Sequence, residues 1–268
     1  MSRSPFSSSP SFARYVAIGD SSTEGIDDPD DRGHYRGWAD RLAAHIASAQ
    51  PEPLLYANLA VRGLKTHEIL GEQLAPAVAM RPDVATVFCG TNDIIRRRVD
   101  LASVAADIFT MQRALRAAGA TVLTFTMPDL SEVIPGAGRL RGRLERFNAD
   151  VRASCAETGT LCVDLAKYPV ASDPRLWSDD RLHANSVGHA RIAQGLAHAL
   201  GLPGFDDSWG APLPPRARAS IGERVATEVR WTKRFLVPWV LRRLTGRSSG
   251  DGISAKRPTL TLVTPNSP

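Results

Sequence analysis

The chain has 268 residues, of which 43% are hydrophobic, so it can form the core of one large domain or of a domain with an appendage. It has no apolar run of membrane-spanning length and no signal-peptide pattern at its start, so we expect a soluble cytoplasmic protein. The part from Ala211 onward carries a charge of +8 and the rest −3, which argues against nucleic-acid binding by the main domain.

The first segment with a clear pattern is YVAIGDSSTEG, at residues 15–25. Its apolar run predicts a buried strand, and the glycine, aspartate and serine that follow predict a turn. The hydroxyl of Ser21 would then lie at the carboxyl end of that strand, where α/β folds usually carry their chemistry. Ser21 is therefore the candidate nucleophile.

The chain then alternates helices and strands as far as residue 200. Apolar spacings of three and four predict helices at 38–48, 66–80, 101–118, 140–157 and 185–200. Nearly continuous apolar runs predict strands at 54–61, 83–89, 121–127 and 160–165. Strands of this kind, separated by helices, predict a parallel sheet covered on both faces, which is an α/β fold.

The ends of the chain differ in composition from this middle part. We expect residues 1–14 to be disordered, 204–215 to form a linker rich in proline and glycine, and 247–268 to be a disordered tail. Within that tail, the run TLTLV at 259–263 could instead add an edge strand to the sheet.

Residues 216–246 predict a basic, amphipathic helical extension that Pro238 divides in two. Its apolar face is most simply explained by packing on the chain's own domain. Basic residues and three large aromatic residues would also suit an anionic membrane surface. Contact between copies of the chain, or a cover over the active site, are further alternatives.

Polar residues follow the predicted strands at the points where they end. Ser21 follows the first strand, Gly63 the second and Asn92 the third, while Asp180 and His183 lie in a loop before the last helix. In a parallel sheet these positions meet at the carboxyl edge. The sequence therefore predicts one site built from separate segments.

The motifs at these positions resemble those of the SGNH hydrolases, also called the GDSL esterase/lipase family. The matching segments are GDS at 19–21, NLAVRG at 58–63, GTND at 90–93 and DRLH at 180–183, in the family's order across about residues 15–200. The corresponding hydrolase domain is predicted at 15–203. The resemblance implies a flavodoxin-like three-layer α/β/α sandwich with a five-stranded parallel sheet, followed here by the helical extension.

The resemblance also implies a role for each residue. Ser21 would be the nucleophile, His183 the base that activates it, and Asp180 the carboxylate that orients the imidazole ring. Backbone N–H groups of Ser21 and Gly63 and the side-chain amide of Asn92 would form the oxyanion hole. Segments 27–31 and 129–138 would line the substrate pocket.

Other reactive residue types have simpler interpretations. We expect the cysteines to be buried apolar residues and the remaining histidines to be surface or helix-face residues, and we expect no metal or cofactor. Asp179 is the nearest rival of Asp180 as the partner of His183. The cysteines are Cys89, Cys155 and Cys162, and the other histidines are His34, His45, His67, His189 and His198.

These observations predict a metal-independent serine esterase that acts on small, short-chain acyl esters. An acyltransferase with a sugar or lipid hydroxyl as acceptor would need the same groups. A catalytically silent ligand-binding module, or a protein whose basic extension binds a membrane or a partner, are alternatives of a different class.

Overall fold

A computed structural model describes residues 11–134, 136–215, 221–238, 250 and 252–263. Residues 1–10, most of the segment predicted to be disordered, and 239–249, which end the predicted extension and begin the tail, lie outside the described residues. No helix in the described ranges is long and apolar enough to cross a bilayer.

The centre of the molecule is one sheet of six strands in the order β5-β4-β3-β1-β2-β6. The strands are β1 Arg14–Gly19, β2 Leu54–Asn58, β3 Val84–Phe88, β4 Thr121–Phe125, β5 Leu161–Val163 and β6 Arg257–Val263. Strands β1 to β5 are all parallel, as their apolar composition predicts. Their carboxyl ends therefore meet at one edge.

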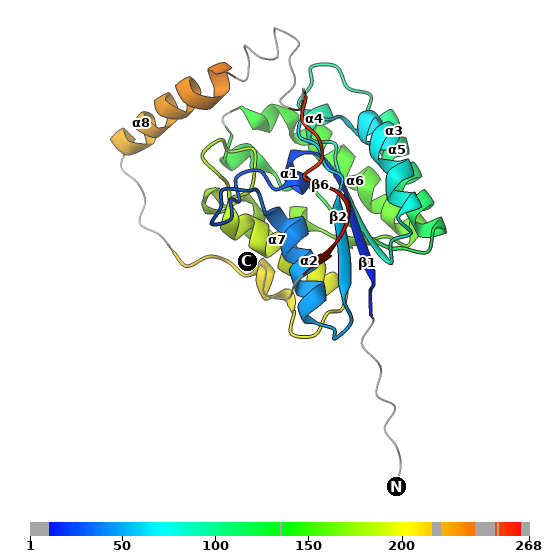
Figure 1. Cartoon of the computed structure of the whole chain (residues 1–268). Coiled ribbons are helices and arrows are strands. Elements are labelled where there is room, and N and C mark those ends of the chain that lie inside the picture. Colours follow the sequence, from blue (N-terminus) through cyan, green and yellow to red (C-terminus); the bar gives the residue numbers. More distant parts are fainter. Residues whose placement is uncertain (1–10, 135, 216–220, 239–249, 251, 264–268) are drawn as a thin grey trace.

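Helices cover both faces of this sheet, so the predicted three-layer α/β/α fold is confirmed (Figure 1). One layer contains α2 and α7, and the other contains α3, α5 and α6. The helices are α1 Ser21–Glu24, α2 Gly37–Ser48, α3 Thr66–Ala79, α4 Thr91–Ile94, α5 Leu101–Ala117, α6 Arg141–Thr158, α7 Ser186–Ala199 and α8 Ile221–Trp231. The short helices α1 and α4 directly follow β1 and β3 and so lie at the carboxyl edge.

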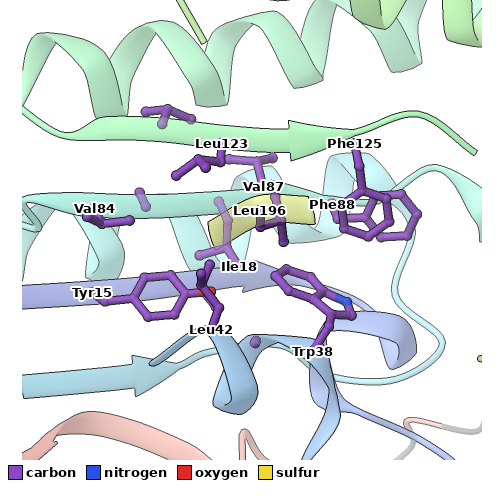
Figure 2. Packing of buried hydrophobic residues seen from close by; sticks show 14 of the residues in the cluster. Tyr15, Ile18, Trp38, Leu42, Val84, Val87, Phe88, Leu123, Phe125 and Leu196 are labelled. Carbon is purple, nitrogen blue, oxygen red and sulfur yellow. The ribbon is translucent and has the colours of Figure 1, made fainter. Parts of the chain in front are cut away.

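Large side chains fill the space between the sheet and the layer of α2 and α7 (Figure 2). Phe88 and Phe125, at the ends of β3 and β4, stack with ring centroids 3.9 Å apart, and Trp38 of α2 meets Phe125 edge-on at 5.3 Å. Trp38 is fully buried. This aromatic group makes the core rigid directly beneath the carboxyl edge.

The sequence-based prediction is wrong for part of the tail. Residues 257–263 form β6, which pairs antiparallel with β2 and adds a sixth strand to the predicted five. The alternative of an edge strand at 259–263 is confirmed. Lys256 fixes the start of this strand, because its ammonium lies 3.1 Å from the Asp40 carboxylate and donates to two backbone carbonyls of the loop before α2.

His189 is not the surface or helix-face residue predicted from the sequence. It is fully buried on α7; its Nδ1 accepts from the Trp38 N–H at 3.1 Å, and its Nε2–H donates to the Ile26 carbonyl at 3.0 Å. Burial lowers the pKa of His189 to about 4. This neutral ring therefore joins α7 to the loop that follows α1.

The cysteines agree with their expected apolar role in two cases out of three. Cys89 and Cys155 are buried, whereas Cys162 is half-buried on β5. All three are free thiols.

Candidate active site

Ser21 begins α1 immediately after β1 ends. The turn between them is tight, because a Cβ atom at Gly19 would collide with the Phe88 carbonyl and with the Thr23 side chain. Asp20 caps α1 by accepting the Ser22 N–H at 3.1 Å. The Ser21 hydroxyl is thus held at the carboxyl edge by the backbone on either side.

The loop before α7 supplies the other two groups of the predicted triad. One carboxylate oxygen of Asp180 accepts the N–H groups of Leu182 at 2.8 Å and His183 at 3.0 Å. Arg181 between them has a left-handed backbone with φ of 64°, which is uncommon for a residue other than glycine. The bend lets a spacing of three residues place both functional side chains next to each other.

The three predicted residues form one hydrogen-bonded chain. His183 Nδ1 lies 2.6 Å from Asp180 Oδ2, and His183 Nε2 lies 2.7 Å from the Ser21 Oγ. The neighbouring Asp179 is exposed, and the carboxylate that bonds to His183 Nδ1 is that of Asp180, so the geometry pairs His183 with Asp180. The arrangement can move a proton from the serine hydroxyl to the imidazole.

Charges around the ring favour its protonated form. Burial alone would lower the pKa of His183, but the hydrogen bond and the charge of Asp180 raise it above its ordinary value. In turn, the bond and charge of His183 outweigh burial and hold the pKa of Asp180 well below its usual range. Asp180 is therefore ionised whenever His183 has to accept a proton.

A second carboxylate, which the sequence placed only in the predicted pocket wall at 27–31, lies beside this pair. Asp27 lies 3.9 Å from His183 Nδ1. Ser178 Oγ lies 2.6 Å from a carboxylate oxygen of each of Asp27 and Asp180, and its single proton serves one of them at a time. Asp27 has a left-handed backbone, with φ of 66°, but nothing in the sequence links it to Ser178 or Asp180, so only the fold connects the three residues.

The carboxylates of Asp27 and Asp180 and the His183 ring are the group of described residues that could surround a cation. Their candidate ligand atoms lie within 4.8 Å of one another. A cation there would compete with the hydrogen bond that joins His183 to Asp180.

Asn92 lies close to the loop of Gly63 and to the residue before Ser21. The Asn92 amide donates to the Leu64 carbonyl at 3.0 Å and faces the buried Asp20 carboxylate at 3.4 Å. Gly63 has a positive φ of 81° in the same loop as Leu64. The structure therefore brings the second and third predicted segments to the nucleophile.

A buried ion pair attaches this loop to α1. Glu24, on α1, is 4% exposed and accepts the Arg62 backbone N–H at 2.9 Å, and its carboxylate also pairs with the Arg62 guanidinium. Because Arg62 precedes Gly63, the contact fixes the loop relative to the nucleophile. Sequence analysis did not single out this pair.

An apolar cavity of about 140 Å³ opens beside the triad. Ser22, Thr91 and Leu182, each adjacent in sequence to a predicted site residue, line one part of it. Segment 129–138 contributes to the wall, as predicted, whereas none of the lining residues comes from 27–31. Deeper apolar lining residues include Phe88, Phe125, Met127, Leu165, Leu176 and Trp209.

The extension reaches the loop that carries Asp180 and His183. Trp231, at the end of α8, is 8% exposed, and its indole N–H donates to the Asp180 carbonyl at 3.1 Å. Arg181 lies over the Trp231 ring at 4.7 Å and forms two 2.8 Å bonds to the Glu228 carboxylate. Part of the basic extension is thus packed against the site.

Comparison with known proteins gives a family match over residues 17–191, to the GDSL-like lipase/acylhydrolase family. No curated protein sequence matches the chain significantly.

Three solved structures have a similar fold. A putative GDSL-like lipase from Parabacteroides merdae is 19% identical, with a TM-score of 0.60 over 72% of this chain and 97% of the other. Axe2, an acetylxylan esterase from Geobacillus stearothermophilus, is 18% identical, with a TM-score of 0.59 over 78% and 99%. The esterase EstA from Pseudoalteromonas sp. is 15% identical, with a TM-score of 0.53 over 70% and 96%. At these identities the likeness shows the fold alone.

Proposed function

Because the chain belongs to the GDSL-like lipase/acylhydrolase family and is a serine hydrolase, we propose that it hydrolyses carboxylic esters through an acyl-enzyme on Ser21. The observation that carries the proposal is the hydrogen-bonded chain from Ser21 through His183 to Asp180, with distances of 2.7 and 2.6 Å. This is the arrangement that a hydroxyl nucleophile needs, since it is weak until a neighbouring base takes its proton.

The reaction follows from these contacts in two halves. Ser21 Oγ attacks the ester carbonyl carbon while its proton passes to His183 Nε2, and the tetrahedral intermediate collapses as His183 returns that proton to the leaving alcohol. Water then attacks the acyl-enzyme, giving its proton to His183. The acid leaves as Ser21 regains the proton, and Asp180 stabilises the imidazolium in both halves.

We propose that hydrogen-bond donors near Ser21 stabilise the negative charge of the tetrahedral intermediate. The backbone N–H groups of Ser21 and Gly63 and the Asn92 amide are the candidates. Asn92 is supported by its position next to Leu64 and Asp20, from which it could turn toward a developing oxyanion. Loss of one such donor typically costs about 10² to 10³ in turnover.

The acyl group would occupy the apolar cavity beside the triad. A cavity of about 150 Å³ in another protein holds one benzene molecule, so 140 Å³ suits an acyl chain of about six carbons at most. We therefore expect short acyl chains, with butyrate preferred to acetate because it buries more apolar surface, and a fall in kcat/KM for dodecanoate.

The decisive experiment compares the full chain with its Ser21→Ala variant on p-nitrophenyl acetate, butyrate and dodecanoate in the presence of a chelator. We expect the variant to lose turnover by about 10⁴ or more. The matched control is Ser103→Ala, which removes an exposed hydroxyl from α5 and should keep normal rates. Turnover by Ser21→Ala equal to that of the control would overturn the assignment of the nucleophile.

The same panel tests acyl transfer as the alternative. If a fluorophosphonate labels Ser21 while ester hydrolysis is slow, and added alcohols accelerate release of p-nitrophenol, the acyl-enzyme passes its acyl group to a hydroxyl in preference to water.

A further inference from the structure

The first described part of the extension has two different faces, and one of them is used by the domain. Glu228 and Trp231 face the loop before α7, where they bind Arg181 and the Asp180 carbonyl. Figure 1 shows α8 at the periphery of the molecule, outside the sheet and its two helix layers. An ion pair and one indole ring thus attach α8 to the domain. The apolar stripe predicted from the sequence does not.

That apolar stripe is exposed. Val229 is 49% exposed, Leu236 36% and Val237 47%, although an amphipathic helix usually buries such residues on its own domain. The expectation that the extension packs its apolar face on the domain is therefore not met by these residues. Exposed apolar side chains close together on a peripheral helical segment are typical of a contact surface.

Basic side chains accompany the exposed apolar residues. Arg230, Lys233 and Arg234 are all exposed, and none of the three forms an ion pair with a carboxylate among the described residues. The chain from Ala211 onward carries eleven lysine and arginine residues against three acidic ones. The contact surface is therefore both apolar and cationic.

We propose that this face, formed by Val229, Arg230, Lys233, Arg234, Leu236 and Val237, docks on an anionic lipid surface. Apolar residues of such a helix enter the boundary between head groups and acyl chains, while lysine and arginine bind the anionic head groups. A second copy of the chain fits less well, because two such faces would bring like charges together. Because Trp231 joins α8 to the Asp180 loop, the bound lipid surface would lie next to the catalytic groups.

The test measures co-sedimentation of the full chain with vesicles of phosphatidylcholine alone and of phosphatidylcholine with one third phosphatidylglycerol. We expect at least about 10-fold tighter binding to the anionic vesicles, weakened when salt is raised from about 0.1 M to about 0.5 M. The variant Val229→Asp with Leu236→Asp should lose this binding. The matched control is Leu262→Asp, which places a carboxylate on another exposed leucine, 58% exposed on β6.

Binding is read without substrate, so the result does not depend on the proposed esterase reaction. Equal binding to both kinds of vesicle, or equal binding by the double variant and the wild type, would overturn the proposal. So would a dimer in sedimentation equilibrium that the double variant dissociates, because the occupant would then be a second copy. Point variants are used because ending the chain at Gly204 would also remove β6.

Discussion

His183 and His189, in the loop before α7 and in α7 itself, are both shielded from solvent. Their pKa values are shifted in opposite directions. Only 14% of the His183 side chain is exposed, and none of His189. The pKa of His183 is raised because Asp180 outweighs burial, whereas burial lowers that of His189 to about 4. The partner therefore decides whether a buried imidazole can take a proton.

Their hydrogen bonds explain why only one of them can act as a base. Both nitrogens of His189 are engaged by backbone groups of Trp38 and Ile26, so its proton is fixed at Nε2. His183 uses Nδ1 for Asp180 and directs Nε2 at the Ser21 hydroxyl. A carboxylate on one nitrogen and a hydroxyl on the other are the contacts that the proposed catalytic base requires, while two backbone partners make a structural joint.

Removing the charge that distinguishes the two rings should change activity most. Asp180→Asn should lower kcat by about 10⁴, because the amide no longer stabilises the imidazolium and favours the wrong tautomer. The rising limb of kcat/KM against pH should lie above pH 6.5 in the wild type and move to lower pH in the variant, since burial then acts without the opposing carboxylate.

The matched control for this change is Asp179→Asn, which removes a carboxylate from the exposed neighbouring residue. It should keep the wild-type rate and pH profile. An Asp180→Asn variant whose limb does not move would contradict the assignment of that limb to His183.

The buried, neutral His189 should make the free energy of unfolding depend on pH. The folded state keeps His189 neutral down to pH of about 4, whereas the unfolded chain takes up a proton near 6.5, so the unfolded state binds more protons between these values. The wild type should therefore lose about 3 kcal/mol of unfolding free energy, relative to His189→Gln, as pH falls from about 7 to about 4.

Urea unfolding of both proteins across this pH range measures that difference. Burial raises the pKa of Asp20 to about 7, so this carboxyl has the opposite effect, adding stability as pH falls, but it is present in both proteins and cancels in the comparison. A pH-independent difference between wild type and His189→Gln would mean that the ring is not held neutral.

The smallest expected effect concerns the contact of the extension with the catalytic loop. Trp231→Phe keeps an aromatic ring under Arg181 but loses the bond to the Asp180 carbonyl, worth about 1 kcal/mol, so kcat should fall by about 5-fold. KM should change little, because the substrate cavity does not include Trp231. A change confined to the melting temperature would show that the contact is only structural.

The sheet and the triad could be predicted from the sequence because each depends on a local pattern repeated in a known order. Apolar runs locate the strands, and the carboxyl ends of parallel strands bring Ser21, Asn92 and His183 together. The burial of His189 could not be predicted in this way, since its partners, Trp38 and Ile26, are more than 150 positions away along the chain. The role of Ser178 as a bridge to Asp27 is hidden for the same reason.

The extension shows a different limit of the sequence. The spacing of apolar residues correctly predicts a helix in Ile221–Trp231. It does not indicate which face of that helix contacts the domain. The answer depends on Arg181, whose left-handed backbone and largely covered side chain can be interpreted only together with Glu228 and Trp231. Long-range ion pairs leave no periodic signal.

The position of the antiparallel strand β6 at the end of the chain affects the nascent protein during translation. Leu54 of β2 pairs with Val263 of β6, so β2 leaves the ribosome long before β6 has been synthesised. At about 5 to 20 residues per second, the roughly 200 residues between them take about 10 to 40 s to translate. During that interval the outer edge of β2 presents unpaired N–H and C=O groups to other nascent chains on the same message.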